Sequence, residues 1–126
     1  MTDSLLVPQQ IRLRKQSREL ALEWPDDVTH SLSFEYLRVH SPSAEVRGHG
    51  PGQEVLQVGK RDVRITRIDP IGQYALRLHF SDGHESGIYS WSYLRELGET
   101  FDRRWTDYLA ALDAAGASRD SDAPAR

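Results

Sequence analysis

The chain has 126 residues, a length that favours one domain and allows a hydrophobic core without covalent cross-links. It contains no cysteine, which excludes disulfides, thiolate metal ligands and a thiol nucleophile. The net charge of −3 disfavours a general nucleic-acid binder. The apolar run near the N-terminus is shorter than a signal-peptide core, and no run approaches the roughly 20 residues that span a bilayer. We therefore expect a cytoplasmic protein with no membrane or nucleic-acid partner.

The first third of the chain predicts two strands and a short helix. Residues 11–15 and 20–24 alternate apolar and polar side chains, which is typical of half-buried strands. The short polar link between them predicts an antiparallel hairpin. Residues 31–40 have apolar side chains at helical spacing behind Ser31, which can cap a helix.

Further along, residues 63–68 and 74–80 predict strands, because their apolar side chains fall on alternate positions. The Asp-Pro-Ile-Gly sequence at residues 69–72 has the composition of a turn between them. Residues 87–90 predict a short edge strand.

Two helices are predicted to close the domain. Residues 91–97 follow Ser90 as a cap and precede Gly98, a typical residue just past a helix end. Residues 101–116 contain an apolar stripe that should face the core, formed by Phe101, Trp105, Tyr108, Leu109 and Leu112.

This order of elements predicts an α+β domain. We expect a small antiparallel β-sheet of about five to six strands, with a short helix and two C-terminal helices packed on it. The domain should span residues 1–117. Residues 118–126 are polar and lack aromatics, so we expect a disordered tail.

The stretch LRVHSPSAEVRGHGPGQ, residues 37–53, has an unusual composition. It packs histidines, arginines, prolines and glycines closely together and has few large apolar side chains after its start. The prolines and glycines predict a loop without regular structure. An ordinary linker needs neither histidine nor arginine, so we expect a functional surface here.

Three blocks of the sequence resemble a known family. LALEWPDD, the 37–53 stretch and YALRLHFSDGHESGIYSWSYLREL are similar to the small domain at the N-terminus of γ-butyrobetaine hydroxylase-type oxygenases, over about residues 20–97. Bacterial stand-alone members are a domain of unknown function, and similar domains are appended to some iron–sulfur carrier ATPases. The resemblance implies an accessory role beside a larger protein.

In the eukaryotic oxygenases this domain resembles a zinc module with three cysteines and a histidine. The matching positions here are Ser41, Ser43, Val46 and His84. A neutral serine hydroxyl is a poor zinc ligand and valine is none, so we expect no cofactor and a lost zinc site. The oxygenase activity is not implied either, because no His-x-Asp or His-x-Glu occurs to build the iron-binding triad.

The candidate residues lie in the 37–53 stretch and the following SDGH turn. Arginine forks bind carboxylates or phosphates, although internal salt bridges are an alternative use. We expect a partner or ligand surface formed by Arg38, Ser41, Ser43, Glu45, Arg47, His49, Asp82 and His84.

Two functions remain open from the sequence. The first is a non-enzymatic binding or accessory module with a protein partner of unknown identity, linked to iron–sulfur assembly or to an oxygenase-type enzyme. The second is a small metal-binding protein or enzyme using His49, His84 and a carboxylate such as Glu45.

Overall fold

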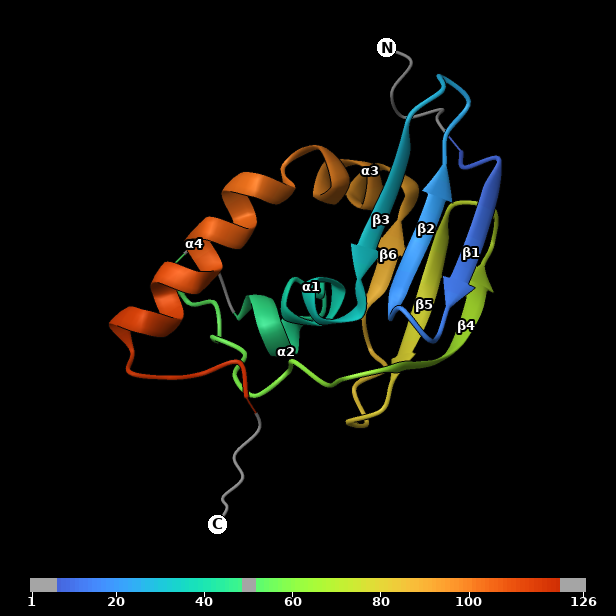
Figure 1. The fold of residues 1–126 in the computed structure, drawn as a ribbon. Helices are drawn as coiled ribbons and strands as arrows, with labels where there is room; N and C mark the ends of the chain where they lie inside the picture. The colour runs from blue at the N-terminus through green and yellow to red at the C-terminus, as the bar shows by residue number, and fades with distance from the viewer. Residues whose placement is uncertain (1–6, 49–51, 121–126) are drawn as a thin grey trace.

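The computed structural model describes residues 7–48 and 52–120, and the fold separates strands from helices. Figure 1 shows the strands gathered on one side of the molecule and the long C-terminal helix on the other, with two short helices between them. The class is α+β with six strands, as the sequence predicts. The strands form two three-stranded antiparallel sheets rather than one continuous sheet.

The first sheet has the order β1–β2–β3, from β1 (Gln10–Arg14), β2 (Glu19–Glu23) and β3 (Thr29–Ser33). The β1–β2 hairpin confirms the prediction, with Leu13 opposite Leu20. The third strand was missed, because its sequence THSLS lacks a clear alternation and was assigned to the following helix. The central position of β2 explains its burial on both faces.

The second sheet has the order β4–β5–β6, from β4 (Ile65–Ile71), β5 (Ala75–Phe80) and β6 (Ile88–Ser90). β4 runs through Asp69 and Pro70, so the turn predicted at 69–72 is wrong. Proline is tolerated there because β4 is an edge strand, where a missing N–H can face solvent. The turn instead follows at Gly72, whose positive φ of 55° suits glycine.

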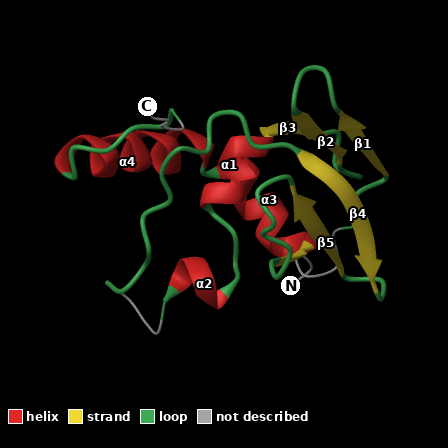
Figure 2. Ribbon diagram, turned by 90° about the horizontal axis from the view of Figure 1, so that it is seen from below, coloured by secondary structure: helices red, strands yellow, loops and turns green. Residues whose placement is uncertain are grey.

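The main core contains side chains from both sheets and the helices. Leu20, Leu22 and Trp24 are buried at 0–1% exposure, which confirms the inward face predicted for residues 20–24. From the second sheet come Leu76, Leu78 and Phe80. Tyr74, the first residue of the strand predicted at 74–80, is 62% exposed and lies before β5 begins. Figure 2 shows the helices on one side of these strands.

Two short helices follow the first sheet. α1 (Phe34–Val39) begins after Ser33, whose hydroxyl accepts a hydrogen bond from the Tyr36 amide, so the predicted start at Ser31 is wrong. α2 (Ala44–Arg47) is one turn long and lies inside the stretch predicted to lack regular structure. A single capped turn fits between the flanking proline and glycine.

α3 (Trp91–Glu99) and α4 (Phe101–Ala114) complete the fold. The predicted cap at Ser90 is confirmed, but α3 continues past Gly98. A Cβ atom at Gly98 would lie 2.3 Å from the His30 ring, so glycine permits close packing of α3 on β3. On α4 the buried residues are Tyr108 and Leu112, which form a second cluster with Val39.

The predicted apolar stripe of α4 is narrower than expected. Trp105 is half-buried and contacts both clusters, whereas Phe101 and Leu109 are 38% and 40% exposed. The helix therefore packs along one edge of its apolar face. Within the described ranges, no helix is both long and apolar enough to cross a bilayer.

Residues 118–120, assigned by the sequence to a disordered tail, are held on the domain. The Arg119 guanidinium donates to both carboxylate oxygens of buried Glu35, at 2.8 and 2.7 Å. The Arg119 carbonyl also accepts from the Arg61 amide. The rest of the predicted tail, residues 121–126, lies outside the described residues.

Candidate functional site

The segment that follows α1 is shaped by local caps. The Ser43 hydroxyl accepts a hydrogen bond from the Glu45 amide and starts α2. Gly48 ends the helix at a φ of 73°, and a Cβ atom there would lie 2.0 Å from the Gln53 carbonyl oxygen. Only glycine satisfies both conditions. These caps fix the direction in which the α2 side chains point.

A hydrogen-bonded cluster joins this segment to the turn between β5 and β6. The Ser41 hydroxyl lies 2.8 Å from His84 Nε2, and His84 Nδ1 lies 3.0 Å from Glu45 Oε1. Beside them the Ser43 and Ser86 hydroxyls are 2.8 Å apart, and Ser86 donates to Glu45 Oε1 at 3.3 Å. We call Ser41, Ser43, Glu45, His84 and Ser86 the clasp.

The backbone of the turn comes unusually close to the clasp. A Cβ atom at Gly87 would lie 2.5 Å from the Ser41 hydroxyl oxygen. Two residues further along the chain, the buried Tyr89 hydroxyl donates to the Leu37 carbonyl at 2.6 Å. Glycine is therefore required at position 87 for the two segments to meet.

The geometry of the clasp defines the state of His84. Its Nδ1–H donates to the Glu45 carboxylate, and its Nε2 accepts from the Ser41 hydroxyl, so both ring nitrogens are used. Burial and the nearby Arg38 guanidinium lower the pKa of His84 below its usual value. The ring is thus neutral at pH 7 and acts as a bridge between a serine and a carboxylate.

Asp82 holds the same turn from the other side. Its carboxylate accepts from Arg38 Nε at 2.9 Å, from Lys60 Nζ at 2.6 Å and from the His84 amide at 3.1 Å. Burial alone would raise the pKa of Asp82, but the hydrogen bonds from Lys60 and the His84 amide, together with Arg38, lower it to about 2. This is the salt bridge that the sequence analysis weighed against an anion-binding role for Arg38.

The family's zinc ion does not fit these residues. Val46 has no donor atom, Ser41 and Ser43 offer neutral hydroxyls, and the lone pair of His84 is already used. Among the described residues, no group of three histidine, aspartate or glutamate side chains could hold a metal ion. His49, a candidate ligand in the sequence analysis, lies outside the described residues.

The order Ser41–His84–Glu45 resembles the nucleophile, base and carboxylate of a serine hydrolase. Two observations disfavour that chemistry. Ser41 is only 1% exposed, and its hydroxyl also accepts a hydrogen bond from the Ser43 amide at 3.2 Å. A nucleophile must reach a substrate carbonyl, and this hydroxyl is enclosed by the turn.

The predicted partner surface therefore divides into two groups. Arg38, Ser41, Ser43 and His84 are buried, so the prediction that they form a contact surface is wrong. Ser41 bonds to His84 and Ser43 to Ser86, as buried polar groups usually do. Arg38 donates to Asp82 through Nε, while its buried Nη1 has no partner among the described residues. Glu45 and Arg47 are exposed, and Asp82 is partly so.

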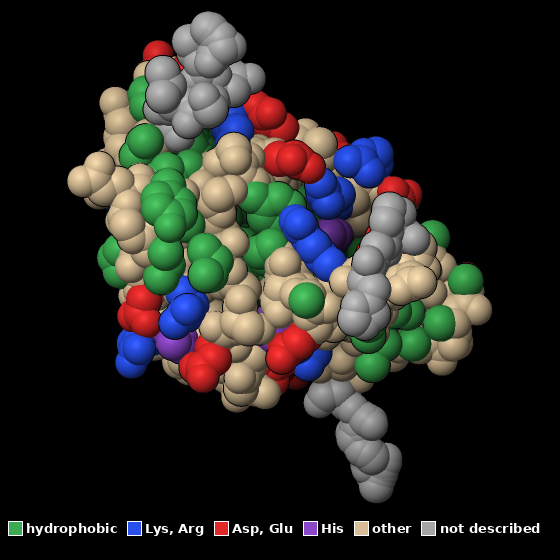
Figure 3. Space-filling model, turned by 180° about the vertical axis from the view of Figure 1, so that it is seen from behind, with side chains coloured by type: hydrophobic (Ala, Val, Ile, Leu, Met, Phe, Trp, Pro, Cys, Tyr) green, Lys and Arg blue, Asp and Glu red, His purple; other side chains and the backbone are tan. Residues whose placement is uncertain are grey.

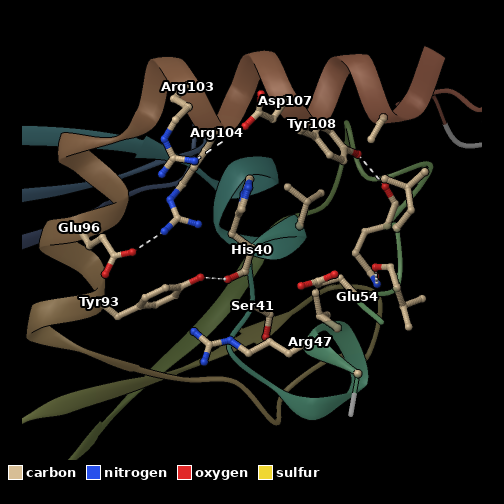
Figure 4. Close-up of a pocket in the computed structure, with 17 residues that line it drawn as sticks. His40, Ser41, Arg47, Glu54, Tyr93, Glu96, Arg103, Arg104, Asp107 and Tyr108 are labelled. Atoms are coloured by element: carbon tan, nitrogen blue, oxygen red, sulfur yellow. Dashed lines mark hydrogen bonds and ion pairs between the residues drawn. The ribbon is translucent and has the colours of Figure 1, made fainter. Parts of the chain in front are cut away.

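Next to the clasp lies a cavity of about 800 Å³, shown in Figure 4. Its walls come from the end of α1, from α2, from residues 54–57 and from α3 and α4. The apolar part of its lining is formed by Val39, Val46, Val55, Leu56, Tyr108 and Ala111. The cavity therefore joins segments that are far apart in sequence.

Charged side chains line the same cavity. Arg104 on α4 pairs with Glu96 on α3, and Arg103 lies 3.8 Å from Asp107. The guanidinium carbon of Arg47 lies 5.0 Å from the centre of the Tyr93 ring. The Tyr93 hydroxyl in turn donates to the His40 carbonyl at 2.6 Å.

His40 is the titratable group in the cavity wall. Its Nδ1–H donates to the Tyr36 carbonyl at 3.1 Å, and the ring packs on the Tyr36 side chain. Burial lowers the pKa of His40 to about 4, so the ring is neutral at pH 7. A neutral ring at this position carries no charge that could interact with the C-terminal end of α1.

Sequence reasoning missed several residues of the site. Ser86 completes the clasp, and Tyr93, Glu54 and Arg104 line the cavity. Serine two residues after His84 in a glycine-bounded turn was a usable signal, since such a hydroxyl can reach a neighbouring loop. The cavity residues carried no such signal, because they come from separate elements.

The chain matches the family described as gamma-butyrobetaine hydroxylase-like, N-terminal, over residues 11–95. Two solution structures of proteins are 49% and 42% identical, cover 95% of this chain each, and superimpose with TM-scores of 0.79 and 0.76. A crystal structure from Acidithiobacillus ferrooxidans, of a protein with unknown function in the DUF971 family, is 41% identical over 72% of this chain, with a TM-score of 0.61. That match covers 91% of the Acidithiobacillus chain.

No match was found among curated proteins. The matched residues include both segments of the clasp and most of α3. The protein belongs to the gamma-butyrobetaine hydroxylase-like N-terminal domain family, and one of the solved structures it resembles is of a protein with unknown function.

Proposed function

We propose that this protein is a non-enzymatic binding module that docks on a protein partner through the face around Arg47. The observation that carries the proposal is the contrast at α2. Ser41, Ser43 and His84 of the clasp are buried and hydrogen-bonded, whereas Arg47 is exposed beside them and its guanidinium lies over the Tyr93 ring. Arginine and tyrosine are, with tryptophan, the side chains enriched at binding hot spots.

The family supports a role beside a larger protein. The matched family is named for the N-terminal part of hydroxylase-like proteins, so a domain of this kind can serve such an enzyme by binding it. An oxygenase-type enzyme or an iron–sulfur assembly protein is the partner class we propose, as an argument from family association. The proposal includes a cytoplasmic location.

Surface charge agrees with a protein partner. On the face shown in Figure 3, basic and acidic side chains are interspersed, with small apolar areas between them. A nucleic-acid interface would instead gather positive charge on one face. This distribution resembles that of ordinary protein interfaces.

The metal-binding alternative, using His49, His84 and a carboxylate, is less well supported. His84 and Glu45 do meet, at 3.0 Å, but their contact is a hydrogen bond that uses Nδ1 of the ring, while Ser41 occupies Nε2. A metal would have to displace Ser41 or Glu45 from the ring. Metal content of the untagged protein distinguishes the two functions.

The test is affinity capture in the native host with wild type, Arg47→Ala and a control, Arg12→Ala, on the distant strand β1. A captured protein is then purified and titrated against each variant by calorimetry. We expect Arg47→Ala to weaken binding by about tenfold or more, the scale of an interface arginine, and Arg12→Ala to bind as wild type does. Equal affinity of wild type and Arg47→Ala would contradict the proposed docking face.

A further inference from the structure

The geometry points to a small zwitterion of the amino-acid class as a ligand of the cavity, with its carboxylate at Arg47 and its ammonium group at Glu54. This inference rests on the proposed binding function and names a ligand for the same face. The supporting observations are the charged side chains that line the cavity and the ion pairs that these side chains form.

Most of the charged side chains in the cavity wall neutralise each other. Glu96 is paired with Arg104, and Asp107 faces Arg103. Arg47 and Glu54 form no ion pair with any residue in the described part of the chain. Figure 4 shows both on the α2 side of the cavity, across from α4. The cavity thus offers one unpaired charge of each sign.

Arg47 is held ready for a carboxylate. Its guanidinium lies over the Tyr93 ring at 5.0 Å, and the Tyr93 hydroxyl is fixed by the His40 carbonyl. Stacking uses the flat face of the guanidinium and leaves its N–H edges free in the plane. Two parallel N–H groups on such an edge match the two oxygens of a carboxylate.

The lining on the same side of the cavity can accept an ammonium group. Glu54 supplies a carboxylate, and the neutral His40 ring supplies Nε2 as an acceptor, because its Nδ1–H is committed to the Tyr36 carbonyl. An ammonium group has three N–H donors and no acceptor, so it suits acceptors of this kind. A simple anion would be repelled by the Glu54 carboxylate, because it has no positive group to pair with that side chain.

The apolar part of the cavity lining suits an aliphatic side chain. Val39, Val46 and Tyr108 are buried at 6–7% exposure and line the cavity. Its volume of about 800 Å³ falls within the range of about 300–1,000 Å³ common for small-molecule sites. L-Leucine therefore serves as the probe.

The experiment is a nuclear magnetic resonance titration of the full ¹⁵N-labelled chain with L-leucine and two matched analogues. 4-Methylpentanoate lacks the ammonium group, and 3-methylbutylamine lacks the carboxylate. We expect saturable shifts of the Val39, Val46 and Leu56 amides with leucine. Each analogue should bind about tenfold more weakly, the loss of one charged hydrogen-bonding group.

Two variants assign the groups. Glu54→Gln should abolish the preference for leucine over 4-methylpentanoate, and Arg47→Ala should abolish the preference over 3-methylbutylamine. Arg12→Ala, on β1, should bind leucine as wild type does. The melting temperature of each variant, measured in parallel, confirms that it is folded.

The inference is wrong if leucine gives no saturable shift at millimolar concentration, or if 4-methylpentanoate binds as tightly as leucine. It is also wrong if Glu54→Gln leaves the preference intact. Failure here while Arg47→Ala still loses its protein partner would remove the ligand and leave the docking function standing. If Arg47→Ala retains both partner binding and leucine binding, both the docking face and the ligand proposal are wrong.

Discussion

Two neighbouring regions use polar side chains in opposite ways. In the clasp, histidine, serine and carboxylate groups bond to one another, and Ser41 and His84 are almost fully buried. In the cavity a few residues further on, Arg47 and Glu54 remain exposed to solvent. A buried polar cluster must satisfy itself and so fixes shape, while an exposed, uncommitted charge is available for a ligand.

The clasp also shows what can replace a metal ion. A structural zinc site in a small domain contributes about 10–16 kcal/mol, whereas a hydrogen bond contributes about 0.5–1.5 kcal/mol net. Hydrogen bonds alone are therefore a weaker connection. The close approach at Gly87 and the Arg38–Asp82–Lys60 cluster bind the same two segments together and make up part of the difference.

The largest expected effect on stability comes from replacing His84, the central residue of the clasp. His84→Ala should lower the free energy of unfolding by about 2–4 kcal/mol, because it removes a buried ring and leaves Ser41 without its main partner. Chemical denaturation at pH 7 measures the change. Arg47→Ala, in the other region, should change it by no more than about 0.5 kcal/mol, as for most surface substitutions.

Equal effects of the two substitutions would break the distinction between clasp and cavity. Glu45→Gln serves as a milder control. Its amide oxygen can still accept from His84 Nδ1, so it should retain most of the stability of the wild type.

The second test asks whether the α4 wall belongs to the domain. Trp105 contacts both apolar clusters and packs on Tyr36 and Tyr108, with ring centres 6.3 and 5.3 Å apart. Trp105→Ala should cost about 2–3 kcal/mol, somewhat less than a fully buried tryptophan because the ring is half-buried. Thermal melting and calorimetry measure it.

A cost below about 0.5 kcal/mol would show that α4 is a peripheral appendage, within the range of surface changes. The cavity would then lack a fixed wall. The exposed Leu109→Ala on the same helix is the matched control, and it should have a small effect.

Much of the fold follows from local patterns. The hairpin at residues 10–23 and strand β5 were predicted because alternation reports burial on one face. β3 was missed because its sequence THSLS has no clear alternation, and α2 was missed because four residues are too few to establish a helical period. The two-sheet arrangement was not predictable, because it depends on which strand edges meet in space.

The site was predictable only in part. The resemblance placed Ser41, Ser43 and His84 together, and the structure does bring them together. Their burial was not foreseen, because the sequence of a loop does not show which side chains another loop will cover. Glu54 and Tyr93 gave no signal at all, since a cavity between distant elements is a property of tertiary packing.

The third test uses pH, because each region contains a histidine whose pKa is lowered by desolvation. The pKa of His40 falls from 6.5 to about 4 on folding, so the unfolded chain binds more protons between these values. Stability from this group is complete above pH 6.5 and is lost as the pH falls toward 4. From pH 7 to pH 5 the free energy of unfolding should drop by about 1–2 kcal/mol.

The lowered pKa of His84 adds a loss in the same direction. Denaturation curves at pH 7 and pH 5 for wild type, His40→Gln and His84→Gln separate the pH-dependent contribution of His40 from that of His84. His40→Gln should show a smaller drop than wild type. A drop as steep as that of wild type would mean that the His40 ring is hydrated and titrates normally.

The smallest expected effect concerns metal removal. If hydrogen bonds have replaced zinc in the clasp, a chelator should leave the melting temperature of the wild type unchanged. The physical reason is the donor set: Val46 cannot ligate, serine hydroxyls are neutral, and both His84 nitrogens are occupied.

The converse variant, Ser41→Cys with Ser43→Cys and Val46→Cys, supplies three thiolates beside His84. Its melting temperature should rise with zinc and fall with chelator, because zinc binding is coupled to folding. Zinc bound at one equivalent by the wild type, with a lower melting temperature after chelation, would contradict the replacement. A triple-cysteine variant that ignores zinc would instead show that these positions do not converge on one point, and that the clasp arose without the geometry of a metal site.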